Sequence, residues 1–314
     1  MKTGMADWRC TAAQTTLKTT ASLAGIGVHS GRSVRVTLRP AAAGSGIVWR
    51  RTDVPAAVAL VRGRWDRVTS TRLSTVLSNR HGVSVGTVEH LLAALHASGV
   101  DNLLIDIDGT EVPILDGSAA PWMALVAQAG VVRQAARRRQ LRVLRPVQVD
   151  DRSAFVRVSP ADTQRFSVEI DFADPAVGRQ ARSIELEHTG FDADIAPART
   201  FGFLPEIDAL RAQGLALGGS LDNAVVVDNG RVLNAGGLRF ADEFVRHKIL
   251  DCVGDLYLAG APLIGHVEAR RPGHALNNRL LRALFAQPDA WAWETCGAEA
   301  RYPADTAPPG RLVA

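Results

Sequence analysis

The stretch His247-Lys248-Ile249-Leu250-Asp251-Cys252-Val253-Gly254-Asp255 predicts a helix with one polar face. At about 100° per residue, its histidine, lysine and two aspartates fall within an arc of roughly 100°, and apolar side chains cover the other faces. Asp251 follows His247 by four residues, so both side chains can reach one divalent metal ion. A solvated polar face is the common explanation of such a charge run. The pattern therefore leaves a metal site and a solvated face as alternatives.

The composition is typical of a globular protein long enough for two domains. The chain has 314 residues, of which 46% are hydrophobic and 22% are charged. Aromatic residues make up only 5%, so we expect a mostly aliphatic core. No run of about eighteen apolar residues occurs, and no apolar segment follows Lys2, so we expect no transmembrane segment and no signal peptide. Cys10, Cys252 and Cys296 are far apart in sequence, which fits a reducing cytoplasm better than a disulfide framework.

The net charge of +4 is mild, but one segment is strongly basic. It contains Arg133, Arg137, Arg138, Arg139, Arg142 and Arg145. A nucleic-acid-binding module could use such a run, and a steep salt dependence of binding would reveal it. The segment lacks interleaved aromatic residues for stacking on bases, so we interpret it as a solvated linker and expect no nucleic-acid partner. Weak attraction to an anionic membrane surface or to phosphorylated substrates is a second interpretation.

Two halves of the chain have a similar order of predicted elements. In the first half we expect a strand around residues 34–38, a helix over 88–97, a strand over 102–107 and a helix over 121–128. In the second half we expect strands over 166–172, 224–227 and 264–269, with helices over 242–258 and 277–285. Because strands and helices mix without a regular βαβ period, the class is α+β.

The basic segment is the natural boundary between these halves. We predict an N-terminal domain over residues 1–133, a C-terminal domain over 141–286 and a loosely held tail over 287–314, which is rich in Pro, Ala and Gly. Within the second domain, segment 201–219 combines apolar residues with closing glycines. On pattern alone it is a core helix that ends at a glycine, and an apolar groove is the alternative.

Two further histidines are candidates for chemistry. His90 follows Glu89 at the start of a predicted helix and faces away from the apolar stripe of that helix. The small side chains of Ala93 and Ala94 lie beside it and leave room for another element to approach. His274 follows Pro-Gly directly before a helix, where it could donate a proton or have no role.

Taken together, these segments resemble the UDP-3-O-acyl-N-acetylglucosamine deacetylase family, the zinc amidases of lipid A synthesis in Gram-negative bacteria. The resemblance covers nearly the whole chain. Its motifs are GIGVHSG at 25–31, TVEHLLAAL at 87–95, EVPILDGS at 111–118, ARTFGF at 198–203, GLALGGS at 214–220, FVRHKILD at 244–251 and GHALNN at 273–278.

The resemblance implies two similar two-layer sandwich domains with the active site in the cleft between them. It implies one catalytic zinc, held by His90, His247 and Asp251 with water in the fourth position, and iron as an alternative metal. Zinc lowers the pKa of bound water to about 7. The remaining implied roles are Glu89 as general base, Thr200 and Lys248 as donors to the oxyanion, His274 as the acid that protonates the leaving amine, and Asp255 as the carboxylate that keeps His274 charged.

The resemblance also implies the substrate contacts. Segment 201–219 becomes an insert that forms an apolar passage for an acyl chain, in which Ile207 lies, while Phe201 contacts the sugar or uracil side. Arg271 pairs with the diphosphate. The implied reaction is hydrolysis of the acetamide of UDP-3-O-acyl-N-acetylglucosamine in the cytoplasm, with contact to a membrane surface left open. A zinc hydrolase of another acylated sugar nucleotide is the alternative. The sequence does not fix the acyl-chain length, the cellular metal or the oligomeric state.

Overall fold

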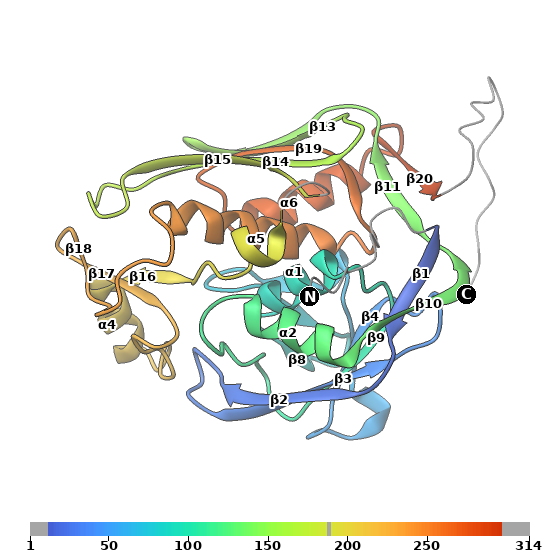
Figure 1. Ribbon diagram of the computed structural model, residues 1–314, viewed down its shortest axis with the longest axis horizontal. Helices are drawn as coiled ribbons and strands as arrows, with labels where there is room; N and C mark the ends of the chain where they lie inside the picture. Colours follow the sequence, from blue (N-terminus) through green and yellow to red (C-terminus); the bar gives the residue numbers. More distant parts are fainter. Residues whose placement is uncertain (1–11, 187–189, 297–314) are drawn as a thin grey trace, which may run out of the picture.

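The first half of the molecule packs helices on a five-stranded sheet (Figure 1). The computed structural model describes residues 12–186 and 190–296. The sheet has the order β2-β3-β9-β4-β5, with β2 Ala21–Ile26, β3 Ser33–Pro40, β9 Leu103–Ile107, β4 Ile47–Arg51 and β5 Leu60–Arg62. A smaller sheet contains β6 Val68–Ser70, β7 Val76–Ser78 and β8 Ser84–Val85. The helices are α1 Glu89–Ala97 and α2 Ala120–Ala129. Short 3-10 turns occupy Ala56–Val58 and Trp65–Arg67.

The second half repeats this plan around the central strand β19 Leu263–Arg270. β19 pairs with β13 Ala154–Ser159, β14 Gln164–Asp171 and β11 Arg139–Val143, and the outer strands are β12 Val147–Asp151, β15 Arg179–Glu185 and β20 Trp291–Thr295. The helices are α3 Phe191–Asp194, α5 Glu243–Tyr257 and α6 His274–Phe285. A projecting unit consists of β16 Phe201–Phe203, α4 Leu204–Ala212, β17 Val225–Asp228 and β18 Arg231–Val232.

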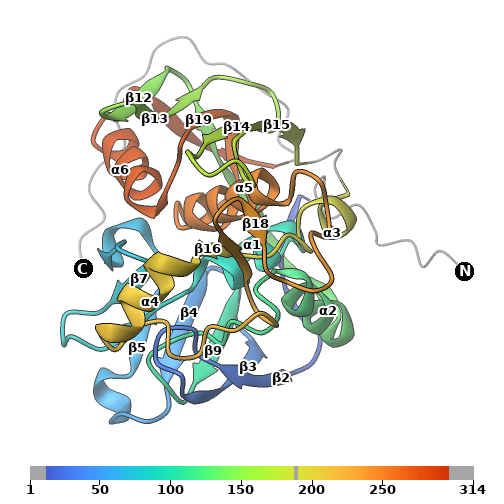
Figure 2. The same cartoon turned by 90° about the vertical axis from the view of Figure 1, so that its left-hand side faces the viewer.

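The helices of the two halves face each other, and the two main sheets lie outside them (Figures 1 and 2). α1 packs against α5 at the centre, so all nine residues of α1 are buried. The predicted α+β class is confirmed. Within the described residues, no helix is long and apolar enough to cross a membrane.

The core is largely aliphatic, as the low aromatic content predicts. In β3 the inward positions Val34, Val36 and Leu38 alternate with more exposed residues, which is the period of a strand with one buried face. The largest fully buried side chains are Trp49, Trp122 and Phe244, and the others of this group are leucines and isoleucines.

The basic segment is not a solvated linker. Residues Val131–Arg137 form β10, which pairs with β1 Ala13–Leu17, and the chain continues directly into β11. Arg138 between these strands is buried and donates a hydrogen bond from Nε to Asp101 at 2.8 Å. Exposure alternates along these strands, with Arg133, Arg137 and Arg139 at exposed positions, and this period of two is what the linker interpretation missed.

Part of the segment predicted as a loose tail is a strand. β20 pairs with β11 from Arg139 opposite Thr295 to Val143 opposite Trp291, and the Trp291 ring packs edge-on against Phe285. Two tryptophans in five residues mark this segment as packed, because large aromatic rings gain much from burial. Residues 297–314 of the predicted tail, and residues 1–11 of the predicted first domain, lie outside the described residues. The domain limits at 133 and 141 stay a prediction.

Candidate functional site

The polar face of α5 is buried in the middle of the molecule. The relative exposures of His247, Asp251 and Asp255 are 2%, 3% and 2%. They lie one turn apart on the side of the helix that meets α1. The solvated-face alternative is therefore wrong. Buried charges and imidazoles need partners, so the next question is what these side chains contact.

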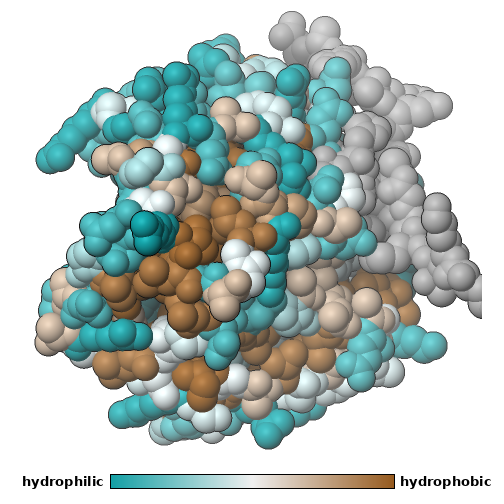
Figure 3. Space-filling model, turned by 60° about the vertical axis from the view of Figure 1, so that its left-hand side comes forward, coloured by the Kyte–Doolittle hydropathy of each residue, from teal (hydrophilic) through white to brown (hydrophobic). Residues whose placement is uncertain are grey.

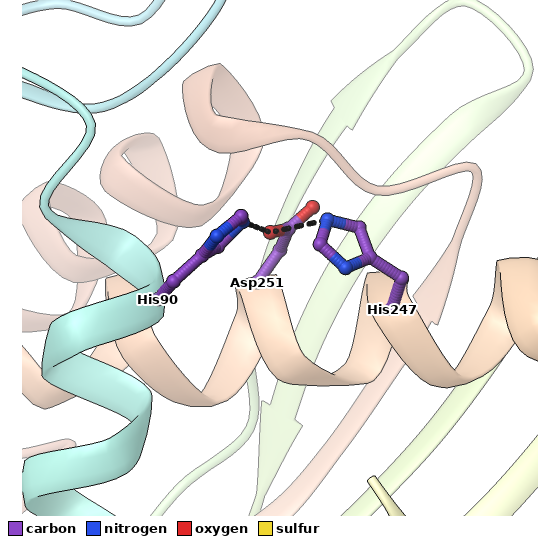
Figure 4. A group of neighbouring side chains, drawn as sticks. All are labelled: His90, His247 and Asp251. Carbon is purple, nitrogen blue, oxygen red and sulfur yellow. Dashed lines mark ion pairs between the residues drawn. The ribbon is translucent and has the colours of Figure 1, made fainter. Parts of the chain in front are cut away.

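His90 of α1 approaches His247 and Asp251 of α5 (Figure 4). The Asp251 Oδ1 atom lies 3.6 Å from His90 Nε2 and 3.4 Å from His247 Nε2. Two ligands held at about 2.0–2.1 Å by one tetrahedral ion are about 3.3–3.4 Å apart. Asp251 Oδ1 is also buried, and no described residue gives it a hydrogen bond. Both the spacing and this unpartnered oxygen fit a divalent metal ion bound by the three side chains.

Neighbouring groups orient these three side chains. His247 Nδ1 donates to the Ala198 carbonyl oxygen at 3.0 Å, which leaves Nε2 as the unprotonated nitrogen that faces Asp251. The next residue, Arg199, is held by the fully buried Glu243, which accepts hydrogen bonds from its main-chain N–H and its guanidinium. Lys248 Nζ donates to the other Asp251 oxygen, Oδ2, at 2.9 Å. Each of these contacts is typical of the outer shell of a metal site.

The protonation states also suit a metal site. Burial lowers the pKa of His247 to about 4, so its imidazole is neutral at neutral pH. Burial alone would raise the pKa of Asp251, but the charges of Lys248 and His247 hold it well below its ordinary value. Neutral imidazole and ionised carboxylate are the forms that bind metal ions.

A second group of ionisable side chains lies beside the first. His274 at the start of α6 has Nε2 3.7 Å from Glu89 Oε1 and Nδ1 2.8 Å from Asp255 Oδ2. Burial would lower the pKa of His274, but the charges of Asp255 and Glu89 raise it to about 10. Burial raises the pKa of Glu89, against the opposing charge of His274. The 2.8 Å contact is a hydrogen bond, so this group has the character of an acid–base pair rather than a metal site.

The two helices touch closely at Gly254. A Cβ atom at this position would collide with the Glu89 carbonyl group and crowd the Ala93 amide nitrogen. The small side chains next to His90 therefore do allow another element to approach, and that element is α5. This contact fixes the distance between the ligands of the two halves.

A cavity of about 400 Å³ opens onto both groups. Thr200 and Phe201 line it next to the histidines, and Ile207 lines it from α4. No residue of α4 is buried, so the core-helix interpretation of segment 201–219 is wrong, although Gly214 does take a left-handed conformation (φ 76°) after the helix end. α4 instead forms one wall of an apolar groove, and Figure 3 shows apolar side chains gathered on this face of the molecule.

Two predicted site residues have other contacts. The Arg271 guanidinium donates to Asp171 at 2.8 Å and to Ser153 at 3.1 Å, and Arg271 is not among the cavity-lining residues. Lys248 lies with Nζ 5.6 Å from the centre of the Phe201 ring, in addition to its bond to Asp251.

The sequence analysis missed the turn between β6 and β7. Leu73 and Ser74 line the cavity, and Thr75 bonds to both Glu89 and Asp255. No local pattern marks these residues, because their partners are far away in the sequence.

Comparison with known proteins agrees with this geometry. A family model described as "LpxC: UDP-3-O-acyl N-acetylglycosamine deacetylase" matches residues 14–286. A UDP-3-O-acyl-N-acetylglucosamine deacetylase of Phenylobacterium zucineum is 48% identical over 282 residues, which cover 90% of this chain and 96% of that protein. A protein of the same name from a Geobacter species is 50% identical over 278 residues, which cover 88% of this chain and 90% of that protein. Another, from Vibrio parahaemolyticus, is 45% identical over 309 residues, which cover 96% of this chain and 99% of that protein.

Proposed function

Because the chain belongs to the UDP-3-O-acyl-N-acetylglucosamine deacetylase family, we propose that it hydrolyses the acetamide of UDP-3-O-acyl-N-acetylglucosamine in lipid A biosynthesis. The products are acetate and the free amine of the sugar. The observation that carries this proposal is the convergence of His90, His247 and Asp251 beside an acid–base pair in one cavity.

His90, His247 and Asp251 are the proposed ligands of a zinc ion, with iron as the alternative metal. The ligand spacing, the unpartnered Asp251 Oδ1 and the neutral state of His247 support this assignment. When bound, the ion supplies Lewis acidity and a water of lowered pKa.

Glu89 and His274 carry the proton transfers in this proposal. The Glu89 carboxylate accepts a proton from the water that attacks the acetamide carbonyl carbon. The carbon–nitrogen bond then breaks, and the leaving amine nitrogen takes a proton from the His274 imidazolium. Asp255 keeps that imidazolium charged through its 2.8 Å hydrogen bond. A buried base of raised pKa and an adjacent cationic acid suit these two roles.

The negative charge that develops on the carbonyl oxygen requires hydrogen-bond donors that are already in place. Thr200 lines the same cavity as the histidines, and its hydroxyl is our first candidate. Lys248 is the second, because its ammonium keeps N–H donors beyond the one that it gives to Asp251.

The apolar side of the cavity is the proposed acyl passage. Ile207 lines it from α4, and each buried methylene of a substrate chain contributes about 0.8 kcal/mol. Phe201 lines the same cavity and is the candidate contact for the sugar or uracil side. Arg271 remains a candidate for the diphosphate. To bind it, the guanidinium would have to exchange its present contact with Asp171 for the phosphate oxygens.

We also propose a cytoplasmic location with peripheral membrane contact. A nucleotide-sugar substrate and the free thiols of Cys252 and Cys296 favour the cytoplasm. Exposed apolar side chains gather around the groove and could enter a lipid interface. They are Ile26, Leu73, Leu217, Leu221 and Leu233. Co-sedimentation with anionic vesicles tests this contact, and a Leu217→Glu variant that sediments as well as the wild type would contradict it.

The test of the main proposal is acetate release from UDP-3-O-acyl-N-acetylglucosamine with and without a chelator. We expect release to stop when the metal is removed and to return with added zinc. Glu89→Ala should keep the metal and lose most turnover, whereas Asp251→Ala should lose the metal. Full activity of the metal-free protein would refute the metal assignment. A series of acyl-chain lengths and sugar nucleotides separates this substrate from another acylated sugar nucleotide.

A further inference from the structure

Thr75 connects the two halves of the acid–base pair. It lies in the turn between β6 and β7 and is 1% exposed. Its main-chain N–H donates to Glu89 Oε2 at 3.1 Å, and its hydroxyl donates to Asp255 Oδ1 at 2.6 Å. Glu89 belongs to α1 of the first half, and Asp255 belongs to α5 of the second. One residue therefore contacts both carboxylates that flank His274.

The hydroxyl of Thr75 completes the bonding of Asp255. The Asp255 Oδ2 atom accepts hydrogen bonds from His274 Nδ1 at 2.8 Å and from Asn277 Nδ2 at 2.9 Å. Among the described residues, the Thr75 hydroxyl is the donor to the other oxygen, Oδ1. Short hydrogen bonds to a carboxylate are the stronger class. With both oxygens bonded, the carboxylate plane cannot rotate, and the imidazole that it holds is fixed as well.

We propose that Thr75 is a positioning residue that holds the Glu89 carboxylate and the His274 imidazole at a fixed relative position. It does so through its own amide, which bonds to Glu89, and through Asp255, which bonds to His274. This inference rests on the proposed deacetylase function. Its geometric basis is the 3.7 Å separation of His274 Nε2 and Glu89 Oε1, which leaves these two groups without a direct hydrogen bond. Their relative placement therefore depends on shared partners, and Thr75 is one that contacts both sides.

The position of Thr75 also links this pair to the substrate. The preceding residues, Leu73 and Ser74, line the cavity. The turn that faces the substrate is thus the turn that holds the acid and the base. A displacement of about 1 Å at reacting groups can reduce the rate about 100-fold, so losing the hydroxyl should affect the chemical step more than substrate binding.

The experiment compares Thr75→Val with Thr75→Ser. Valine has nearly the shape of threonine and keeps the main-chain bond to Glu89, but it lacks the hydroxyl, whereas serine keeps the hydroxyl. We expect Thr75→Val to lower kcat by roughly 10- to 100-fold, with KM within about twofold and an unchanged metal content. Thr75→Ser should retain activity within about threefold. If Thr75→Val does not fold, Thr75→Ala replaces it, because alanine also removes the hydroxyl without adding bulk.

Thr69→Val is the matched control. Thr69 lies at the exposed end of the same hairpin, where its hydroxyl bonds to the Ser78 hydroxyl at 2.8 Å. This variant also loses one side-chain hydrogen bond of the hairpin, but that bond does not involve Asp255, so kcat should not change. Wild-type kcat in Thr75→Val, or equal losses in Thr75→Val and Thr75→Ser, would overturn the proposal.

A second measurement separates this inference from the proposed function. In nitrogen–proton NMR spectra, the His274 Nδ1–H signal, identified by its loss in His274→Gln, should shift in Thr75→Val and stay in place in Thr75→Ser and Thr69→Val. This readout needs no substrate. If the wild type releases no acetate, the proposed function fails, and the NMR comparison still decides whether Thr75 positions His274. An unmoved signal in Thr75→Val refutes the inference.

Discussion

The contact of α5 with α1 at Gly254 makes a sharp prediction for Gly254→Ala. The added methyl carbon would lie 2.8 Å from the Glu89 carbonyl carbon and 3.1 Å from the Ala93 amide nitrogen. Relaxed carbon contacts are about 3.5–4.0 Å, so the helices must separate by on the order of 1 Å. Both neighbours are main-chain atoms, and no side-chain rotation can relieve the contact.

This separation should have two measurable effects. Overpacking of a core costs about 1–3 kcal/mol of unfolding free energy. The gap between His90 Nε2 and Asp251 Oδ1, now 3.6 Å, would widen because the two atoms belong to the separating helices. We expect metal affinity to fall by about 10- to 100-fold, the range typical of disturbed metal surroundings.

Competition with a chromophoric chelator measures the affinity, and thermal unfolding of the metal-free protein measures the stability. Gly236→Ala is the control, since a Cβ there meets no atom of the described part of the chain within 4 Å. The reasoning is refuted if Gly254→Ala binds metal as tightly as the wild type and unfolds at the same temperature.

Three further predictions concern stability, pH and substrate length. Glu243→Gln leaves the Arg199 guanidinium without its buried counter-charge, so denaturant unfolding should report a loss of about 3–5 kcal/mol. Burial, with help from the charge of Arg138, lowers the pKa of His96 to about 3. The unfolded state, with a pKa near 6.5, therefore binds the proton first, and the metal-free protein should lose stability as the pH falls from about 6.5 toward 3; a flat unfolding midpoint across this window would contradict it. Ile207→Trp narrows the apolar groove and should raise KM for long acyl chains more than for short ones.

The helices and strands of the core were predictable because their burial repeats regularly. The helix expected over 242–258 is α5, Glu243–Tyr257, and the strand expected over 102–107 is β9, Leu103–Ile107. The pattern of α5 also places His247 and Asp251 on one face, which is a local property of the helix.

Long-range packing was not predictable from the same patterns. The period of α4 is that of a core helix, but α4 packs mainly on the small sheet of β16 and β17 and lines a cavity, so none of its residues is buried. No sequence pattern marks Thr75, because Asp255, which accepts the hydrogen bond from its hydroxyl, lies 180 positions later in the chain. Periodicity reports which face of an element is buried, but not what lies opposite that face.

The complete burial of α1 has a consequence for how the molecule comes apart. Its nine residues are buried, with α5 of the other half and α2 of its own half packed against them, so pulling the halves apart would expose apolar surface on both. Alone, neither half would have a stable surface where α1 now packs against α5. We therefore expect one cooperative endotherm in calorimetry instead of two, and chains cut to either half alone should aggregate.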